Sequence, residues 1–123
     1  MADLALVVDG TAAIPPFEQV RAQLADRIVS GALPAGERLP SVRALADALG
    51  LAVNTVARAI KELEAAGLVE TRGRNGTVVA WSPDAAARAL EQAAAAYAAQ
   101  ARSAGVDPGE AAALVARALG LPG

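Results

Sequence analysis

Residues 39–79, LPSVRALADALGLAVNTVARAIKELEAAGLVETRGRNGTVV, contain most of the local signals that determine the fold. Ser41 is a good N-cap for a short helix, and Gly50 stands where a left-handed residue ends such a helix. A second helical segment follows directly and ends at Gly67. The spacing therefore predicts two helices joined by a tight turn.

Apolar residues recur at helical spacing in both segments and define one inner face for each helix. The first face consists of Val42, Leu45, Ala46 and Leu49, and the second consists of Val56, Ala59, Ile60 and Leu63. The opposite face of the second helix carries Asn54, Thr55, Arg58 and Lys61. We expect the apolar faces to be buried and this polar face to be exposed.

The residues after the second helix predict a small β-hairpin. Residues 68–71 and 77–80 are rich in branched side chains, and the tip between them is Arg-Gly-Arg-Asn-Gly. Glycine and asparagine tolerate the positive φ angles that a hairpin tip requires. This order of elements is a winged helix-turn-helix, a fold that places one helix in the major groove of DNA.

The flanks of this region have simpler patterns. Residues 4–8 are short, branched and bounded by Asp9-Gly10, which predicts a strand. Apolar residues fall on one helical face from Phe17 onward, and Gly31 ends that helix. The inner face of this helix consists of Val20, Leu24 and Ile28.

The sequence becomes alanine-rich after Trp81, which we expect to be a packing anchor. Ser82 and Pro83 begin a helix that runs to about residue 103. Asp107 and Glu110 have the spacing of a capping box and begin a final helix. The apolar side of that helix consists of Leu114, Val115, Ala118 and Leu119. We predict an αα-hairpin that has too little bulk to be a separate domain.

This hairpin has two interpretations. Small residues would allow close approach of a helix from a second copy; these are Ala89, Ala93, Ala96 and Ala99. Alternatively, the tail folds back on its own domain. We favour a homodimer through residues 82–123, because a twofold axis matches a palindromic DNA site.

Composition excludes several classes of chemistry. The 123 residues include no cysteine and no histidine, and 54% of them are hydrophobic. Disulfides, thiol nucleophiles, histidine bases and ordinary zinc sites are therefore excluded. We expect no enzyme, no catalytic residue, no metal and no cofactor. No basic segment precedes the first apolar run, and no run is long enough to span a bilayer, so we expect a cytoplasmic protein without membrane contact.

The charge distribution bears on nucleic acid as a partner. The net charge of −2 argues mildly against it. However, residues 17–80 hold eight Lys or Arg and seven Asp or Glu, so the net negative charge lies outside this region. We expect a local positive face and only weak long-range steering toward DNA.

Three segments together resemble the GntR family of bacterial transcription regulators. They are GALPAGERLPSVRALADALGL (31–51), NTVARAIKELEAAGLVETR (54–72) and RGRNGT (72–77). The resemblance covers residues 17–79, about half of the chain. The leading segment and the short two-helix tail are similar to the YtrA-type subgroup, in which such a tail implies a homodimer rather than a metabolite pocket.

We call the predicted hairpin, residues 68–80, the wing. The resemblance implies roles for seven matching positions, which are expected to contact DNA or shape the wing: Arg43, Asn54, Thr55, Arg72, Gly73, Gly76 and Thr77. An arginine can pair with guanine or a phosphate, and short polar side chains at a helix N-terminus lie close to base edges. Neighbouring polar residues complete the candidate set: Ser41, Arg58, Lys61, Arg74 and Asn75.

Some residues depart from the family pattern. Ala52 and Val53 stand where many members have a capping residue followed by Arg or Pro, and Ala57 replaces a second Arg. A missing cap costs about 1 kcal/mol of helix stability. We therefore expect sequence readout to depend less on arginine, with modest affinity at physiological salt.

Several candidates have a simpler interpretation. Arg58 and Lys61 are also consistent with a solvated helix face that pairs with nearby glutamates. Ser41 is expected to act mainly as a cap. Glu37 and Arg38 are expected to form a local surface pair.

The sequence thus predicts a mainly α protein with a small β-sheet. Residues 1–81 would form a winged helix-turn-helix domain with an N-terminal strand, and residues 82–123 a dimerisation tail. The leading hypothesis is a dimeric repressor that binds an inverted repeat in double-stranded DNA. The alternative is a winged-helix protein-interaction module that does not bind DNA. The first requires Arg43, Arg58, Arg72 and Arg74 to converge on one face. No effector pocket is evident, and a small molecule between the tail helices stays an open alternative.

Overall fold

The computed structural model describes residues 4–122 and divides into two compact units, one up to Ser82 and one from Pro83. The first unit contains α1 (Pro16–Val29), α2 (Val42–Leu49), α3 (Val53–Ala65), β1 (Val69–Thr71), a short 3-10 helix (Gly73–Asn75) and β2 (Thr77–Val79). The second unit contains α4 (Pro83–Ser103) and α5 (Pro108–Ala118). The predicted fold class, mainly α with a small sheet, is confirmed, whereas the dimerisation role of the second unit stays a prediction.

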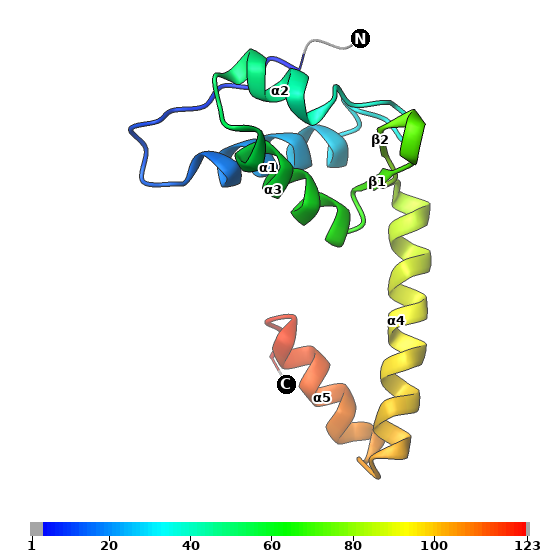
Figure 1. Ribbon diagram of the computed structural model, residues 1–123. Helices are drawn as coiled ribbons and strands as arrows, with labels where there is room; N and C mark the ends of the chain where they lie inside the picture. Colours follow the sequence, from blue (N-terminus) through cyan, green and yellow to red (C-terminus); the bar gives the residue numbers. More distant parts are fainter. Residues whose placement is uncertain (1–3, 123) are drawn as a thin grey trace. The chain divides into compact units, whose positions relative to one another are not determined.

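The core of the first unit lies between α1 and α3, and α2 packs against α3 (Figure 1). The three predicted core residues of α1 are almost completely buried, as are the four of α3. Burying one such aliphatic side chain contributes about 1.5–3 kcal/mol relative to exposure. Trp81 packs partly buried against this core, as expected.

Local capping explains where α2 begins and ends. The hydroxyl of Ser41 accepts a hydrogen bond from the Ala44 N–H at 3.0 Å, which confirms its role as N-cap. Gly50 has the left-handed conformation with φ of 67°, and its N–H donates to the Ala46 carbonyl. Ala52 begins α3 without a side-chain cap, as the sequence predicts. The turn between the helices therefore depends on Gly50.

The hairpin pairs β1 with β2 in antiparallel register, with Val69 opposite Val79 and Thr71 opposite Thr77. The other edge of β2 is also occupied. The Leu39 N–H donates to the Thr77 carbonyl at 2.8 Å, and the Val79 N–H donates to the Glu37 carbonyl at 2.8 Å. Residues 37–39 thus pair with β2 along the edge that β1 leaves free. The sequence did not predict this pairing.

The tip of the hairpin is compact. The Arg72 N–H donates to the Gly76 carbonyl at 2.7 Å, and the Gly76 N–H donates to the Gly73 carbonyl at 3.0 Å. Gly73 and Gly76 both have positive φ, at 53° and 73°. Gly76 also has ψ of −150°, a backbone region that essentially only glycine adopts.

Arg38 braces this tip, and the predicted Glu37–Arg38 surface pair is wrong. The Arg38 Nη2 donates to the Arg74 carbonyl at 3.2 Å. A Cβ atom added at Gly76 would meet Arg38 Nε at 3.4 Å. In residues 4–122 the ion pairs are Glu18–Arg21 and Glu70–Arg72. Arg38 forms an antiparallel β-bridge with Val78 of β2. This bridge places its side chain beside the hairpin, where it binds the Arg74 carbonyl rather than Glu37.

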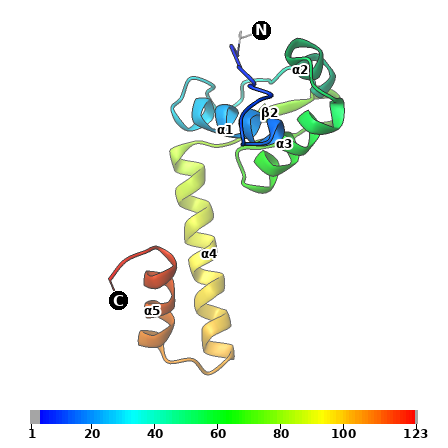
Figure 2. The ribbon, with the colours of Figure 1, turned by 90° about the vertical axis from the view of Figure 1, so that its left-hand side faces the viewer.

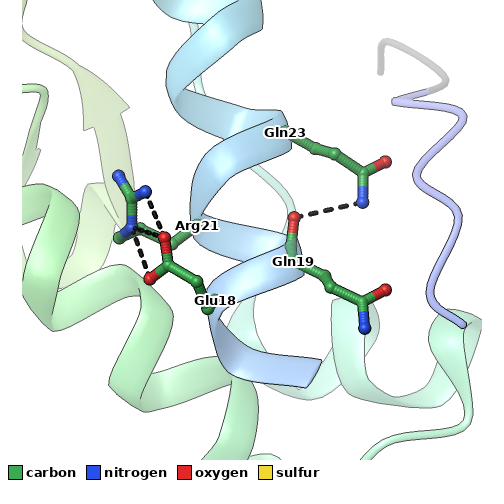
Figure 3. Close-up of polar contacts among 4 residues, drawn as sticks. All are labelled: Glu18, Gln19, Arg21 and Gln23. Carbon is green, nitrogen blue, oxygen red and sulfur yellow. Dashed lines mark hydrogen bonds and ion pairs between the residues drawn. The ribbon is translucent and has the colours of Figure 1, made fainter. Parts of the chain in front are cut away.

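The predicted strand at residues 4–8 is wrong. This segment forms no strand, and side chains of α1 hydrogen-bond to its backbone instead. The Gln23 amide accepts from the Val7 N–H at 3.0 Å and donates to the Val7 carbonyl at 2.7 Å. Gln19 makes the same pair of contacts with Asp9, at 2.8 and 2.9 Å. Figure 3 shows both glutamines on the side of α1 that faces this segment, away from Glu18 and Arg21.

A third contact continues this ladder, since Arg27 Nη2 donates to the Ala5 carbonyl at 3.2 Å. The three side chains follow one another at one helical turn on α1, and their backbone partners are every second residue of the leading segment: Asp9, Val7 and Ala5. The amide side chains therefore take the place of a neighbouring strand. Leu4 is buried in the core, and Leu6 and Val8 pack partly against it.

In the second unit, α4 and α5 lie side by side as the predicted αα-hairpin (Figure 2). The Tyr97 hydroxyl donates to the Ala111 carbonyl at 2.8 Å. Asp107 caps α5 by accepting from the N–H groups of Gly109 and Glu110 at 3.0 and 3.4 Å. Among residues 83–122 of this unit only Ala111 is buried, so the predicted apolar side of α5 is exposed.

Over residues 4–122, no helix combines the length and the apolar character that crossing a membrane requires.

The side-chain ladder on α1 should stabilise the first unit. Changing Gln23 to Ala removes both hydrogen bonds to Val7 and should lower the free energy of unfolding by about 1 kcal/mol. Urea denaturation measures this change, and hydrogen exchange of the Val7 amide should become faster. Gln92→Ala on the exposed surface of α4 is the control and should leave both unchanged. Equal stabilities of the two variants would contradict a structural role for the ladder.

The wing should depend on the backbone conformation of Gly76. Changing Gly76 to Ala should lower the free energy of unfolding by about 1–3 kcal/mol, because a side chain is strained in this region of φ and ψ. Gly10→Ala is the matched control, since φ there is not positive and a Cβ would meet nothing within 4 Å. Thermal denaturation of both variants tests this, and a neutral Gly76→Ala would show that the wing relaxes freely.

Candidate nucleic-acid interface

The exposed face of α3 lies opposite its buried stripe. Asn54, Arg58 and Lys61 follow the helical repeat i, i+4, i+7, and all three are exposed. Thr55 lies beside them and is half-buried. The helix therefore presents one polar stripe from its first turn onward, as the sequence predicts.

The first turn of α3 also offers backbone donors. The N–H groups of Thr55 and Val56 donate to the Ala52 carbonyl at 3.1 and 3.4 Å. The earlier N–H groups of a helix have no partner within the helix, and the helix dipole makes this end electropositive. Because Ala52 supplies no capping side chain, this end of α3 is open to an external acceptor.

Arg58 lies over the ring of Phe17, with its Cζ atom 3.7 Å from the ring centroid. Pro16, Phe17, Asn54, Thr55 and Arg58 line one shallow hollow, in which the start of α1 meets the start of α3. The simpler alternative, in which Arg58 pairs with glutamates of its own helix, is absent from the ion pairs of residues 4–122. No local sequence pattern indicated this contact, apart from Phe17 being the single phenylalanine of the chain.

A glutamate of α3 has a different role. Glu64 accepts a hydrogen bond from the Thr71 N–H at 3.2 Å, which joins the end of α3 to β1. This contact helps to fix the wing relative to the helix. The Glu64 carboxylate therefore stabilises the fold and forms no ion pair with Arg58.

The wing carries two exposed arginines, which differ in their hydrogen bonds. Arg72 Nε donates to Glu70 at 3.2 Å, and both side chains are about half exposed. An exposed ion pair of this kind contributes about 0–1 kcal/mol, so a phosphate can displace the glutamate at little cost. Arg74 is exposed, and its carbonyl accepts from Arg38. Asn75 belongs to the 3-10 helix at the tip.

A second hollow lies between the segment that precedes α2 and the first turns of α2. Its lining consists of Arg38, Leu39, Pro40, Ser41 and Ala44. Arg43 is exposed at the second position of α2 and does not line it. Arg38 was not among the predicted site residues, although it stands beside the wing. Its place on the bridge with Val78 could not be read from the local sequence pattern.

The structure thus brings some of the predicted residues together and leaves others apart. Asn54, Thr55 and Arg58 share one hollow, and Ser41 shares the other with Arg38. Gly73 and Gly76 shape the wing tip, and Thr77 begins β2. That Arg43, Arg58, Arg72 and Arg74 converge on one face stays a prediction.

The carboxylate groups with shifted pKa values have structural partners. Hydrogen bonding to Arg21 lowers the pKa of Glu18, and hydrogen bonding to Thr11 lowers the pKa of Asp9. Glu18 and Arg21 form an ion pair on α1 (Figure 3). In the part of the chain that the structure describes, no group of His, Cys, Asp or Glu could hold a metal ion.

Comparisons with known proteins agree with this geometry. The family model described as bacterial regulatory proteins, gntR family, matches residues 16–79. The HTH-type transcriptional regulator Rv1152 of Mycobacterium tuberculosis is 58% identical over 74 residues, which are 60% of this chain and 61% of that protein. The HTH-type transcriptional repressor YtrA of Bacillus subtilis is 38% identical over 72 residues, which are 58% of this chain and 55% of that protein. The match therefore spans less than two thirds of either relative.

Two solved structures have the same fold. YtrA from Sulfolobus acidocaldarius, a GntR-family transcription factor, superposes with a TM-score of 0.59 at 28% identity, covering 74% of this chain and 97% of that one. The AraR DNA-binding domain in complex with operator ORE1 gives a TM-score of 0.53 at 25% identity, covering 59% of this chain and 89% of that one. The similarity to the two YtrA proteins supports the YtrA-like subgroup, and the family model matches more than half of the chain. This chain therefore belongs to the gntR family of bacterial regulatory proteins.

Proposed function

We propose that this chain is a transcription regulator that binds an inverted repeat in double-stranded DNA as a homodimer and acts as a repressor. The observation that carries the proposal is the exposed polar stripe of α3, whose first turn is uncapped and open to an external acceptor. The match to a DNA-binding domain in complex with its operator supports DNA as the partner. A relative named as a repressor, YtrA of Bacillus subtilis, supports the direction of control.

In this proposal α3 enters the major groove. Asn54 and Thr55 in its first turn reach base edges or the nearest phosphates. Arg43 extends from the start of α2 and pairs with guanine O6 and N7 or with a phosphate. The glycines of the wing allow its backbone to approach the sugar-phosphate chain closely, and Arg72 and Arg74 supply charge there.

The balance of charges bears on affinity. Residues 17–80 carry a net charge of only +1, so the field of this region attracts DNA weakly. Binding then depends on the local contacts of a few cations, each of which releases counterions from DNA. Each copy of the chain is therefore a weak binder, and two copies on one inverted repeat bind more tightly.

The second unit supports a dimer. Leu90 and Leu119 are 71% and 69% exposed, and Leu114 is 47% exposed. No residue of α4 is buried in the single chain. A second copy would cover this apolar surface, and its twofold axis would match that of an inverted repeat.

The alternative function is a protein-interaction module that keeps the winged-helix fold without binding DNA. The acidic net charge of −2 is the observation that favours it. The two functions differ in how binding responds to salt and to DNA sequence.

The DNA proposal predicts the following titration. The chain should bind a duplex selected from a randomised pool, and its affinity should fall with a log–log salt slope of roughly −0.9 per phosphate contact. Arg43→Ala should weaken binding by about 1–3 kcal/mol and relax preference at one base position if Arg43 reads guanine. Fluorescence anisotropy measures both effects.

The matched control for this experiment is Arg88→Ala, which removes an exposed arginine from α4 and should leave binding nearly unchanged. Salt-independent binding, or equal affinity for a scrambled duplex, would reject a regulator that reads sequence. Capture of a protein partner without any DNA binding would favour the interaction module.

The dimer predicts twice the chain mass in sedimentation equilibrium. Changing Leu114 and Leu119 to Glu places charges on the exposed apolar side of α5 and should give a monomer, because a buried unpaired charge is costly. Val29→Glu is the control, since this exposed apolar residue lies at the end of α1. A wild-type monomer at micromolar concentration would contradict the proposal.

A further inference from the structure

Phe17 is the single phenylalanine of the chain, and it stands outside every group of residues expected to touch DNA. It is the second residue of α1, and its side chain is half-buried. Its ring faces the Arg58 guanidinium, whose Cζ atom lies 3.7 Å from the centroid. An aromatic ring at this distance attracts a guanidinium through its quadrupole.

The Arg58–Phe17 contact differs from the contacts of Arg38 and Arg72, because those two arginines use N–H donors. Arg72 uses its Nε to bind Glu70, and Arg38 uses its Nη2 to bind the Arg74 carbonyl. A guanidinium stacked on a ring uses only its flat face, and its N–H donors point outward in its plane. Arg58 is therefore held in place while its donors stay available.

The surroundings of Arg58 suit an anionic ligand. The hollow that it lines contains the polar side chains of Asn54 and Thr55 and no carboxylate. The positive ends of both α1 and α3 lie at this hollow, since Pro16 and Phe17 begin one helix and Asn54 and Thr55 the other. The only anionic groups that line a DNA groove are phosphates.

We propose that Phe17 is a positioning residue for DNA binding: its ring holds Arg58 so that the guanidinium meets a DNA phosphate already ordered. The inference rests on the proposed DNA-binding function. A long side chain that is ordered before binding loses less conformational entropy when the complex forms. Phe17 thus raises affinity without touching DNA.

A double-mutant cycle tests this role. Phe17→Leu keeps the apolar bulk but removes the ring face, and it should weaken binding of the selected duplex about two- to fivefold, the value of an exposed cation–π contact. Arg58→Ala should weaken binding of all sequences alike and lower the salt slope by about 1. In the Arg58→Ala background, Phe17→Leu should have no further effect.

Lys61→Ala is the matched control, because Lys61 lies one turn further along the same face of α3 and has no ring beneath it. In that background Phe17→Leu should keep its full effect. Phe17→Trp should restore wild-type affinity, because tryptophan offers the strongest ring face for a cation. The thermal denaturation midpoint of each variant separates loss of folding from loss of positioning.

A second measurement needs no DNA. Since the chain has one phenylalanine, labelling with 4-fluorophenylalanine gives a single ¹⁹F resonance. This resonance should move in Arg58→Ala, stay in place in Lys61→Ala, and move again when the selected duplex is added to the wild-type chain.

Two outcomes would overturn the inference while leaving the proposed function intact. One is wild-type affinity of Phe17→Leu, and the other is an equal loss in the Arg58→Ala and Lys61→Ala backgrounds. A wild-type chain that binds no duplex in a salt-dependent way would reject the proposed function, and the positioning role with it.

Discussion

The packing of α1 against α3 is the contact on which the rest of the first unit depends. Val20, Leu24 and Ile28 meet the buried stripe of α3, and none of these side chains has more than a few per cent of its surface exposed. Because that stripe is fixed, the opposite face of α3 must point outward with its polar residues. The same packing brings Phe17 under Arg58, so the scaffold and the candidate interface meet at the start of α1.

The wing depends on a second set of contacts that come from outside the hairpin. Residues before α2 pair with the free edge of β2, and Glu64 at the end of α3 accepts from the Thr71 N–H. Arg38 then reaches the tip and donates to the Arg74 carbonyl. A hairpin of two three-residue strands is marginal by itself. These contacts explain how so small a wing keeps one orientation relative to α3.

Helices and their inner faces could be predicted from the sequence because periodicity and caps are local signals. Ser41 and Gly50 mark α2 as expected, and the apolar stripes of α1 and α3 are buried as expected. The failures all involve partners that are distant in sequence. The amides of Gln19 and Gln23 replace a strand partner for residues 4–8, and the contact of Arg58 with Phe17 was not predicted. Periodicity contains no information about such contacts. Glycine spacing, in contrast, correctly indicated the wing tip.

In the proposed complex, the first turn of α3 and the wing together form the DNA-binding surface. Amide chemical-shift perturbation on a titration with the selected duplex tests it most directly, because every described residue except proline reports separately. The largest changes are expected at Asn54, Thr55 and Arg58 and in the wing tip, with little change in α5. Uniformly small changes, or changes centred on α5, would contradict it.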